Sequence, residues 1–348
     1  MTLTVGLCGI RGYVGQILAK LIMQHPNLAL TNLYARKPHD DLLTEQCLAQ
    51  GATWQDSVSI GQSDNDILFL ATPADASVAL MEHLTAFPGV VIDMSGAFRL
   101  NAADYEPWYG FTHSLPRELS NFVYGLSPWW QQTSKDTLTR IANPGCYATC
   151  ALMSLIPLLK EKIIHPDNII IDAKSGASGA GRAAKDHLQF GEVHDNFYAY
   201  RIGQHQHTPE IKRFLALFAG ERCDIQLTTS LLPIHRGLTA TIYAQACQDD
   251  ETTRQAIHAA YEKAYADYPF FQACDLISEP ARGQALAMIS ACAHTANTHV
   301  SYFVKNNRII LSATIDNLLK GAASQAIESV NSLFGFKPAT GLVMGEMS

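Results

Sequence analysis

Features that mark several protein classes are missing from this chain of 348 residues. No apolar run approaches the roughly 20 residues that span a bilayer, and residues 1–10 lack the basic start and unbroken apolar stretch of a secretory signal. The eight cysteines form no C-x-x-C pair, so we expect neither a disulfide framework nor a zinc ribbon. A formal net charge of −7 argues against a general surface for nucleic acid or anionic membranes. These absences predict a cytoplasmic protein with reduced thiols and no metal, nucleic-acid or membrane partner.

The composition, 47% hydrophobic and 16% charged residues, is that of a globular protein with a sizeable core, and the length allows two domains. In the first 100 residues short apolar strands alternate with helical segments, which is typical of a parallel sheet with crossover helices. A helix should occupy 15–26, and the aromatic-rich stretch 101–140 should form loops and short elements. Strands are expected at 3–9, 28–35, 66–73, 90–96 and 140–143.

The pattern changes after residue 146, where longer strands predict a mixed, largely antiparallel sheet. A helix over 252–267 interrupts these strands, and the helical spacing of 317–336 has a glycine after its last apolar residues. We expect the strands at 168–176, 224–234, 237–246, 299–307 and 308–317.

The stretch "NPGCYAT", residues 143–149, places a thiol at the start of an apolar run that indicates a helix. Pro144 fixes its own φ and Gly145 permits angles closed to other residues, so the turn ahead of Cys146 is restricted. Unpaired N–H groups and the helix dipole favour a thiolate at this position, which predicts a nucleophile. A buried structural cysteine is the alternative, and it is the interpretation that suits Cys150, one turn later.

Glycines 9, 12 and 15 follow the first strand and open a helix, which fits a G-x-x-G-x-x-G dinucleotide fingerprint. A glycine-rich turn without a ligand is the alternative. The second strand ends in "LYARKP", which has no acid for a ribose 2′-hydroxyl, whereas Arg36 and Lys37 suit a 2′-phosphate. We therefore expect NADP, the alternative for these two cations being a solvated basic loop.

The segment "GQHQHTPEI" should place His205 and His207 on one face of an extended stretch, ahead of a helix capped by Thr208 with Pro209 in its first turn. A nicotinamide cofactor and a thiol at a helix start together suggest hydride transfer at a carbonyl held as a thioester or thiohemiacetal. Histidine is suited to move the proton. A metal-ligand pair and a structural pair are the alternatives, although no companion ligand has metal-site spacing.

An anionic substrate needs donors, and "SGASGAGR" at 175–182 offers backbone N–H groups, two hydroxyls and a guanidinium after a strand. These are the ingredients of an anion nest. Arg236 in "PIHRGLTA" and Arg99 in "SGAFRL" are further candidates. A structural ion pair is the alternative for each of these two arginines.

Taken together, nine motifs in a fixed order make the chain similar to the N-acetyl-γ-glutamyl-phosphate reductases, the arginine-biosynthetic branch of the semialdehyde dehydrogenase family. The similarity runs nearly the full length, and "NPGCYAT" with "IDNLLKGAA" is its most specific combination. The motifs are the glycine motif at 9–15, "VIDMSGAFRL", "WYGFTH", "VYGL", "NPGCYAT", "SGASGAGR", "HQHTPEI", "HRG" and "IDNLLKGAASQAIESVN".

The resemblance implies an α/β protein with a Rossmann-type NADP-binding domain, residues 1–145 and 314–348. It implies a second, α+β domain over 146–313 for catalysis and oligomerisation, built on a mixed, largely antiparallel sheet. The implied reaction is the NADPH-dependent reductive dephosphorylation of N-acetyl-L-glutamyl 5-phosphate to N-acetyl-L-glutamate 5-semialdehyde and phosphate, the third step of arginine biosynthesis. The implied assembly is a homo-oligomer, a dimer or tetramer.

The resemblance also assigns roles. Cys146 is the nucleophile, and His207 is the first choice for the acid/base, with His205 assisting. The substrate's anionic groups would be held by Asn143, Ser175, Ser178, Arg182, Arg236 and Arg99. The cofactor would be held by Gly9, Arg11, Gly12, Tyr13, Val14, Gly15, Arg36, Lys37, Thr72, Pro73, Ser95, Gly179 and Asn317.

Three departures from the family pattern stand out. Arg11 occupies a position where the family often has serine, so a side-chain cation is expected at the phosphates. Gln206 replaces a common arginine, and residues 280–299 match poorly, so no substrate contact is assigned to that stretch. The rival functions are another acyl-phosphate reductase, acting on aspartyl or aminoadipyl phosphate, and a non-catalytic NADP-sensing protein.

Overall fold

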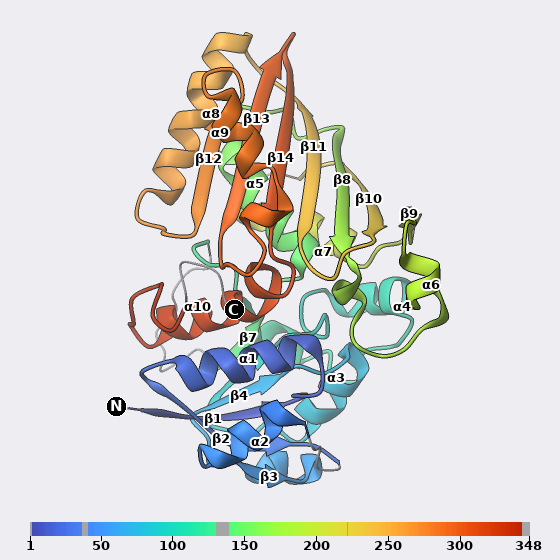
Figure 1. Cartoon of the computed structure of the whole chain (residues 1–348), viewed down its shortest axis with the longest axis vertical. Coiled ribbons are helices and arrows are strands. Elements are labelled where there is room, and N and C mark those ends of the chain that lie inside the picture. The colour runs from blue at the N-terminus through green and yellow to red at the C-terminus, as the bar shows by residue number, and fades with distance from the viewer. Residues whose placement is uncertain (1, 37–40, 130–138, 221, 343–348) are drawn as a thin grey trace. The chain divides into compact units, whose positions relative to one another are not determined.

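The computed structural model describes residues 2–36, 41–129, 139–220 and 222–342 (Figure 1). The chain forms two compact units, Met1–Gly145 with Ala322–Leu342, and Cys146–Gly321. The chain therefore returns to the first unit after Gly321, whereas the sequence predicts this boundary between residues 313 and 314. None of the helices in the described ranges has the length and apolar character needed to cross a membrane.

Parallel strands build the sheet of the first unit, which has seven strands among the described residues, in the order β3-β2-β1-β4-β5-β7-β6. All residues of β4 and β5 are buried, which explains why these strands are apolar runs in the sequence, apart from Asp93 at the end of β5. The strands are β1 (Leu3–Cys8), β2 (Leu28–Tyr34), β3 (Thr53–Gln55), β4 (Ile67–Leu70), β5 (Val90–Asp93), β6 (Val123–Tyr124) and β7 (Arg140–Ala142). The five strands predicted for this region are confirmed, whereas the short β3 and β6 carry too few residues to show a periodicity.

The helices of the first unit lie between these strands along the chain, apart from the last one, which follows the second unit. They are α1 (Tyr13–Gln24), α2 (Leu42–Ala49), α3 (Ala74–Glu82), α4 (Tyr105–Tyr109) and α10 (Ser324–Leu333), with 3-10 turns η1 (Ser57–Gln62), η2 (Ala102–Asp104) and η3 (Glu118–Asn121). Strand β1 lies between β2 and β4, so the strand order reverses there, and ligands of such sheets bind at the carboxyl ends of the strands beside this reversal.

The second unit is built on a mixed sheet in the order β12-β13-β14-β11-β8-β10-β9. The pairs β8–β10 and β12–β13 are parallel and the others antiparallel, so the sheet is mixed and largely antiparallel, as the sequence predicts. The strands are β8 (Ile169–Gly176), β9 (Tyr198–Tyr200), β10 (Ile225–Leu232), β11 (Leu238–Gln245), β12 (Phe271–Asp275), β13 (Thr298–Lys305) and β14 (Arg308–Ile315). The helical elements are α5 (Cys146–Lys160), α6 (Phe190–Val193), α7 (His207–Ala219), α8 (Asp250–Tyr265), α9 (Pro280–Leu286), η4 (Ala177–Ala180), η5 (Asp186–Leu188), η6 (Ile289–Ala291) and the π-helical turn η7 (Leu319–Ala323).

Helix α5 is the buried centre of the second unit, and its residues from Tyr147 to Leu159 are all buried. Pro157 lies inside this helix and has no N–H to donate to the carbonyl of Met153, four residues earlier. The hydroxyl of Tyr265, from α8, donates to that carbonyl at 2.5 Å, and Tyr261 donates to the next one, Ser154, at 2.9 Å. Two tyrosines of α8 thus satisfy the carbonyls around the proline.

The segment predicted as one helix over 317–336 is instead divided. Residues Leu319–Ala323 form the π-helical turn η7, and α10 follows it and ends at Leu333. Gly335 has φ +72° and lies after the last turn, as predicted from the sequence, because this left-handed conformation is open mainly to glycine.

Candidate active site

Cys146 is the first residue of α5 and is partly exposed, whereas Cys150 is completely buried. Burial raises the pKa of the Cys150 thiol, which donates to the carbonyl of Ala313 at 3.5 Å. Cys150 is therefore the structural thiol that the sequence suggests. Burial also raises the pKa of Cys292 to about 12 and of Cys8 to about 11, so neither suits a nucleophile.

Two phenols lie beside Cys146. The hydroxyls of Tyr147 and Tyr200 are 3.0 Å apart. Burial raises the pKa of both, to about 12 for Tyr200, and the negative charge of the Cys146 thiolate adds to each increase. A protonated phenol pair therefore lies within electrostatic reach of Cys146. Sequence reasoning missed both tyrosines: Tyr147 was visible inside "NPGCYAT", whereas nothing in the sequence marked Tyr200.

The two histidines of "HQHTPEI" pack on the same tyrosine. The ring centroids of His205 and His207 lie 5.2 Å and 5.7 Å from that of Tyr147, and 4.8 Å from each other. The extended segment expected here is wrong, because Gln206 is already in helical conformation and α7 begins at His207. Thr208 is thus inside the first turn and is not the cap, yet the helical bend still brings both rings together.

The two imidazoles differ in their surroundings. Burial, and then the nearby charges of His207 and Arg201, lower the pKa of His205 to about 2, so its ring is neutral. Its Nδ1 accepts a hydrogen bond from the backbone N–H of His207 at 3.2 Å. His207 instead has a carboxylate near it, since Oε2 of the fully buried Glu210 lies 3.9 Å from its Nε2. The arrangement favours His207 as the ring that can take up a proton.

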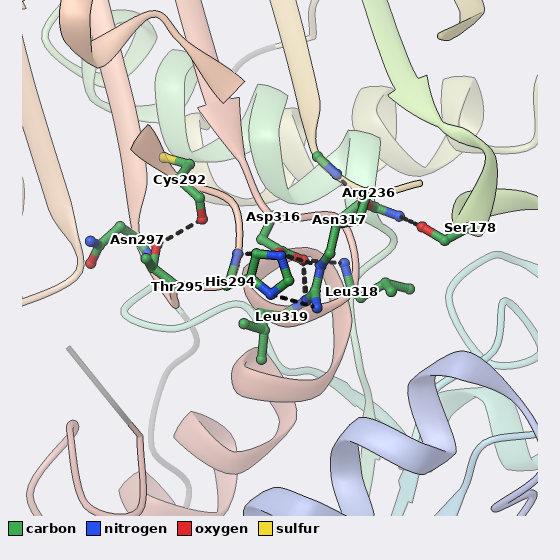
Figure 2. Close-up of polar contacts among 11 residues, drawn as sticks. Ser178, Arg236, Cys292, His294, Thr295, Asn297, Asp316, Asn317, Leu318 and Leu319 are labelled. Atoms are coloured by element: carbon green, nitrogen blue, oxygen red, sulfur yellow. Dashed lines mark hydrogen bonds and ion pairs between the residues drawn. The ribbon is translucent and has the colours of Figure 1, made fainter. Parts of the chain in front are cut away.

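The loop after β8 lies against the turn that carries Arg236 (Figure 2). Asn317 connects the two, because its Nδ2 donates to Ser178 Oγ at 3.0 Å and its Oδ1 accepts from the backbone N–H of Gly237 at 2.7 Å. Ser175 is also buried, at the end of β8. The structure thus brings Ser178, Arg236 and Asn317 together, with Asn317 as the connector.

The backbone nest expected at 175–182 is wrong in part. The N–H groups of Gly176, Ala177 and Ser178 donate to the carbonyls of residues 237, 234 and 235, and are therefore occupied. Gly179 lies close to the Ser175 hydroxyl, where an added Cβ would be 3.1 Å from its oxygen. Arg182 is exposed beyond the turn, and its contact with substrate remains a prediction. The hydroxyls of this loop and the neighbouring Arg236, more than the backbone N–H groups, are what the site offers an anion.

In the first unit, the three motif glycines differ in how much space the fold leaves for a side chain. Gly9 has φ +96°, and an added Cβ would lie 2.3 Å from the carbonyl oxygen of Ala71. A Cβ on Gly15 would lie 2.1 Å from the carbonyl oxygen of Gly9. At Gly12, which precedes α1, the nearest atom to an added Cβ is that same oxygen at an ordinary 3.6 Å. The fold itself therefore leaves room at Gly12, which fits the close approach of a cofactor's pyrophosphate.

Most of the other expected cofactor residues follow strands of one parallel sheet, whereas Gly179 and Asn317 lie in the second unit, after β8 and β14. Cys8 pairs with Tyr34 and Leu70, and Leu70 with Asp93, so β1, β2, β4 and β5 end at one edge. Ser95 donates to the buried carboxylate of Asp93 at 2.8 Å. Lys37 lies outside the described residues. Those placed after these strands are Arg11, Tyr13, Val14, Arg36, Thr72, Pro73 and Ser95, of which Arg11, Arg36 and Pro73 are exposed.

Arg99 and Asn143 hold the turn that precedes Cys146. The buried Arg99 donates from Nε to the carbonyl of Asn143 at 2.7 Å and from Nη2 to that of Met94 at 3.0 Å. Asn143 donates from Nδ2 to the carbonyl of Ala322 at 3.2 Å. These contacts are to backbone carbonyls, so the geometry explains how the two residues stabilise the turn. Contact of either residue with the substrate remains a prediction.

In the described ranges, no group of three or more His, Cys, Asp or Glu side chains is placed to hold a metal ion. Glu210 is a carboxylate that lies near the pair His205 and His207, 3.9 Å from Nε2 of His207.

Comparisons with known proteins agree with this geometry. Residues 4–137 match the profile of the semialdehyde dehydrogenase NAD binding domain, and residues 146–317 that of the semialdehyde dehydrogenase dimerisation domain. The N-acetyl-gamma-glutamyl-phosphate reductase of Campylobacter jejuni is 37% identical over 347 residues, 98% of each chain. That of Staphylococcus saprophyticus is 34% identical over 342 residues, 97% of each chain.

Solved structures share the fold. Aspartate semialdehyde dehydrogenase from Francisella tularensis has a TM-score of 0.70 at 16% identity, covering 96% of this chain and 100% of that one. The Candida albicans enzyme, solved with NADP, has a TM-score of 0.62 at 15% identity, covering 96% and 99%. The chain belongs to the semialdehyde dehydrogenase family, together with the N-acetyl-gamma-glutamyl-phosphate reductases that it matches along nearly its whole length.

Proposed function

We propose that this chain reduces N-acetyl-L-glutamyl 5-phosphate with NADPH, giving N-acetyl-L-glutamate 5-semialdehyde and phosphate. The observation that carries the proposal is a partly exposed thiol on the first residue of α5, next to a tyrosine on which two imidazoles pack. Curated relatives of this name, at 34–37% identity, support the substrate. The aspartate semialdehyde dehydrogenases share only the fold.

The first step uses only residues of the second unit. The Cys146 thiol gives its proton to His207, and the sulfur attacks the acyl carbon, forming a C–S bond. N–H groups in the first turn of α5 stabilise the oxyanion, a contribution of about 3–4 kcal/mol per donor in comparable sites. The C–O bond then breaks, and phosphate leaves with the electron pair and takes the proton from His207. Glu210 stabilises the imidazolium while His207 carries that proton.

The second step reduces the thioester on Cys146. When NADPH is bound, it supplies a hydride to the acyl carbon. The C–S bond of the resulting thiohemiacetal breaks, the aldehyde is released, and Cys146 regains a proton from solvent through His207. His205 stays neutral because of its low pKa, and it supports His207 by accepting its backbone N–H.

The cofactor would lie on the glycine turn before α1, with Gly12 nearest the pyrophosphate. We propose NADP in preference to NAD because β2 ends without a carboxylate and Arg36 follows it, exposed. Exchanging Arg36 for glutamate should raise the KM for NADP⁺ at least tenfold and change the KM for NAD⁺ little. An unchanged preference would contradict this assignment.

We also propose a cytoplasmic homo-oligomer, assembled through the second unit. Ile170, Tyr243 and Ile310 lie side by side on β8, β11 and β14, each 37–41% exposed, whereas their neighbours Ile171, Ile242 and Leu311 are buried on the opposite face. An exposed apolar row at the centre of a sheet suits burial against a second copy. Tyr243→Lys should shift the sedimentation coefficient towards that of the monomer.

The reaction is tested in its reverse direction, by following NADP⁺ reduction with N-acetylglutamate semialdehyde and phosphate. We expect phosphate-dependent turnover, a much lower rate with aspartate semialdehyde, and a loss on the order of 10³-fold or more in Cys146→Ala. Cys150→Ser is the matched control and should keep the rate within a few fold. Substantial turnover by Cys146→Ala would overturn the assignment of the nucleophile.

A further inference from the structure

The stretch 280–299, to which the sequence assigns no role, approaches the candidate substrate site through His294. This residue lies just after η6 and is exposed. Its Nδ1 is 3.2 Å from Nη1 of Arg236 (Figure 2). Because a guanidinium can only donate, Nδ1 is the acceptor and the ring hydrogen is on Nε2. His294 therefore presents an N–H donor beside the guanidinium.

The backbone of His294 is held in an uncommon conformation. Its φ is +66°, in the left-handed region, where a residue with a side chain pays a conformational cost. Its N–H donates to Oδ2 of Asp316 at 2.6 Å, which fixes this conformation. The ring position next to Arg236 is thus set by a backbone contact with Asp316.

Asp316 also holds Arg236. Its carboxylate is fully buried, with Oδ2 2.8 Å from Nε and Oδ1 2.9 Å from Nη2 of the guanidinium. Oδ1 further accepts from the N–H groups of Leu318 and Leu319, at 2.8 Å and 3.0 Å. This carboxylate fixes one edge of the guanidinium, so the outer hydrogens on Nη1 and Nη2 keep a defined direction.

We propose that Asp316 is a positioning residue that holds Arg236 and His294 as one pair of donors for an oxyanion of the substrate, and that His294 determines specificity for it. The inference rests on the proposed function, whose substrates bring two such groups, a carboxylate on the semialdehyde and inorganic phosphate. The pair has directed N–H donors on both residues, and Ser178, joined through Asn317, adds a hydroxyl nearby.

The test uses His294→Asn, because asparagine tolerates a positive φ and so removes the ring with little change to the backbone. We expect the KM for N-acetylglutamate semialdehyde or for phosphate to rise about tenfold, with kcat within threefold and the thermal midpoint unchanged. The affected KM identifies which oxyanion is bound. Asp316→Asn should raise the same KM, and the double variant should show less than the product of the two effects, because the residues act on one group.

Calorimetric titration with N-acetyl-L-glutamate and with inorganic phosphate gives a readout independent of turnover. One of these probes should bind His294→Asn about tenfold more weakly than the unmodified chain. The inference fails if both KM values and both affinities stay within twofold in His294→Asn while the unmodified chain is active. Absence of activity with every semialdehyde would instead overturn the proposed function, and the titrations would still decide the role of His294.

Discussion

Replacing Gly321 by alanine should slow the reaction by displacing Cys146, the proposed nucleophile. Gly321 belongs to the π-helical turn η7, and an added Cβ would lie 2.7 Å from Cβ and 3.1 Å from Cα of Cys146. Optimal separations between such carbons are about 3.5–4.0 Å, so one of the two backbones has to move by roughly 1 Å. A displacement of this size at a reacting group costs on the order of 10²-fold in rate, or about 2.7 kcal/mol of activation free energy.

Three measurements on the Gly321→Ala variant separate misplacement from unfolding. Phosphate-dependent NADP⁺ reduction should show kcat reduced about 100-fold, and iodoacetamide should alkylate Cys146 at a changed rate. Overpacking should lower the free energy of unfolding by about 1–3 kcal/mol, whereas replacing a glycine in a helical turn should raise it by about 0.5–1 kcal/mol. The variant should therefore still fold. Thermal unfolding verifies this.

Gly191→Ala is the matched control, because an added Cβ on this α6 glycine meets no atom within 4 Å. Its kcat should stay within twofold of the unmodified chain. A folded Gly321→Ala protein with the same kcat as the control would show that the close approach to Cys146 has no part in catalysis.

Further predictions follow from single contacts. Tyr265→Phe leaves the Met153 carbonyl beside the helix proline without its donor and should lower the free energy of unfolding in urea by about 1–3 kcal/mol. Gly12→Ala should raise the KM for NADP⁺ at least tenfold without lowering the thermal midpoint, whereas Gly9→Ala should lower the midpoint. The pKa of His205 is about 2 in the folded chain and about 6.5 in the unfolded chain, so unfolding takes up a proton below pH 6.5. The free energy of unfolding therefore decreases as the pH is lowered below 6.5. Between pH 6.5 and pH 5.5, His205 should account for a decrease of about 1 kcal/mol in the free energy of unfolding, and His205→Gln should remove that decrease in urea titrations.

The elements that the sequence predicts correctly are those whose signal is local. The long strands show their apolar pattern within eight residues, and the glycine turn before α1 is set by contacts between neighbours such as Gly9 and Gly15. The helix start at Cys146 was predicted correctly because a restricted turn and an apolar run adjoin in one short motif. Most of these constraints act within about ten residues, although Gly9 also lies close to Ala71, which follows β4.

The parts of the site that the sequence did not reveal depend on contacts between distant segments. Tyr200 matters because its hydroxyl meets that of Tyr147, 53 residues earlier. The backbone N–H groups after β8 are occupied because that loop pairs with the turn at 234–237, which no local pattern shows. The start of α7 was misplaced because Thr208 and Pro209 also suit the first turn of a helix that begins at His207.

The run from Asp316 to Gly321 shows how one short segment can serve two parts of the site. At its start, the Asp316 carboxylate holds Arg236 and the backbone of His294. At its end, Gly321 touches Cys146, and its N–H donates to the carbonyl of Asp316 at 2.9 Å. Because the same residue closes the turn with its backbone and fixes the guanidinium with its side chain, a change in the carboxylate must also alter the support of Cys146. Asp316→Asn should therefore lower kcat as well as raise a KM, whereas His294→Asn, which leaves the turn intact, should change only the KM. Equal effects of both variants on kcat would contradict this division of roles.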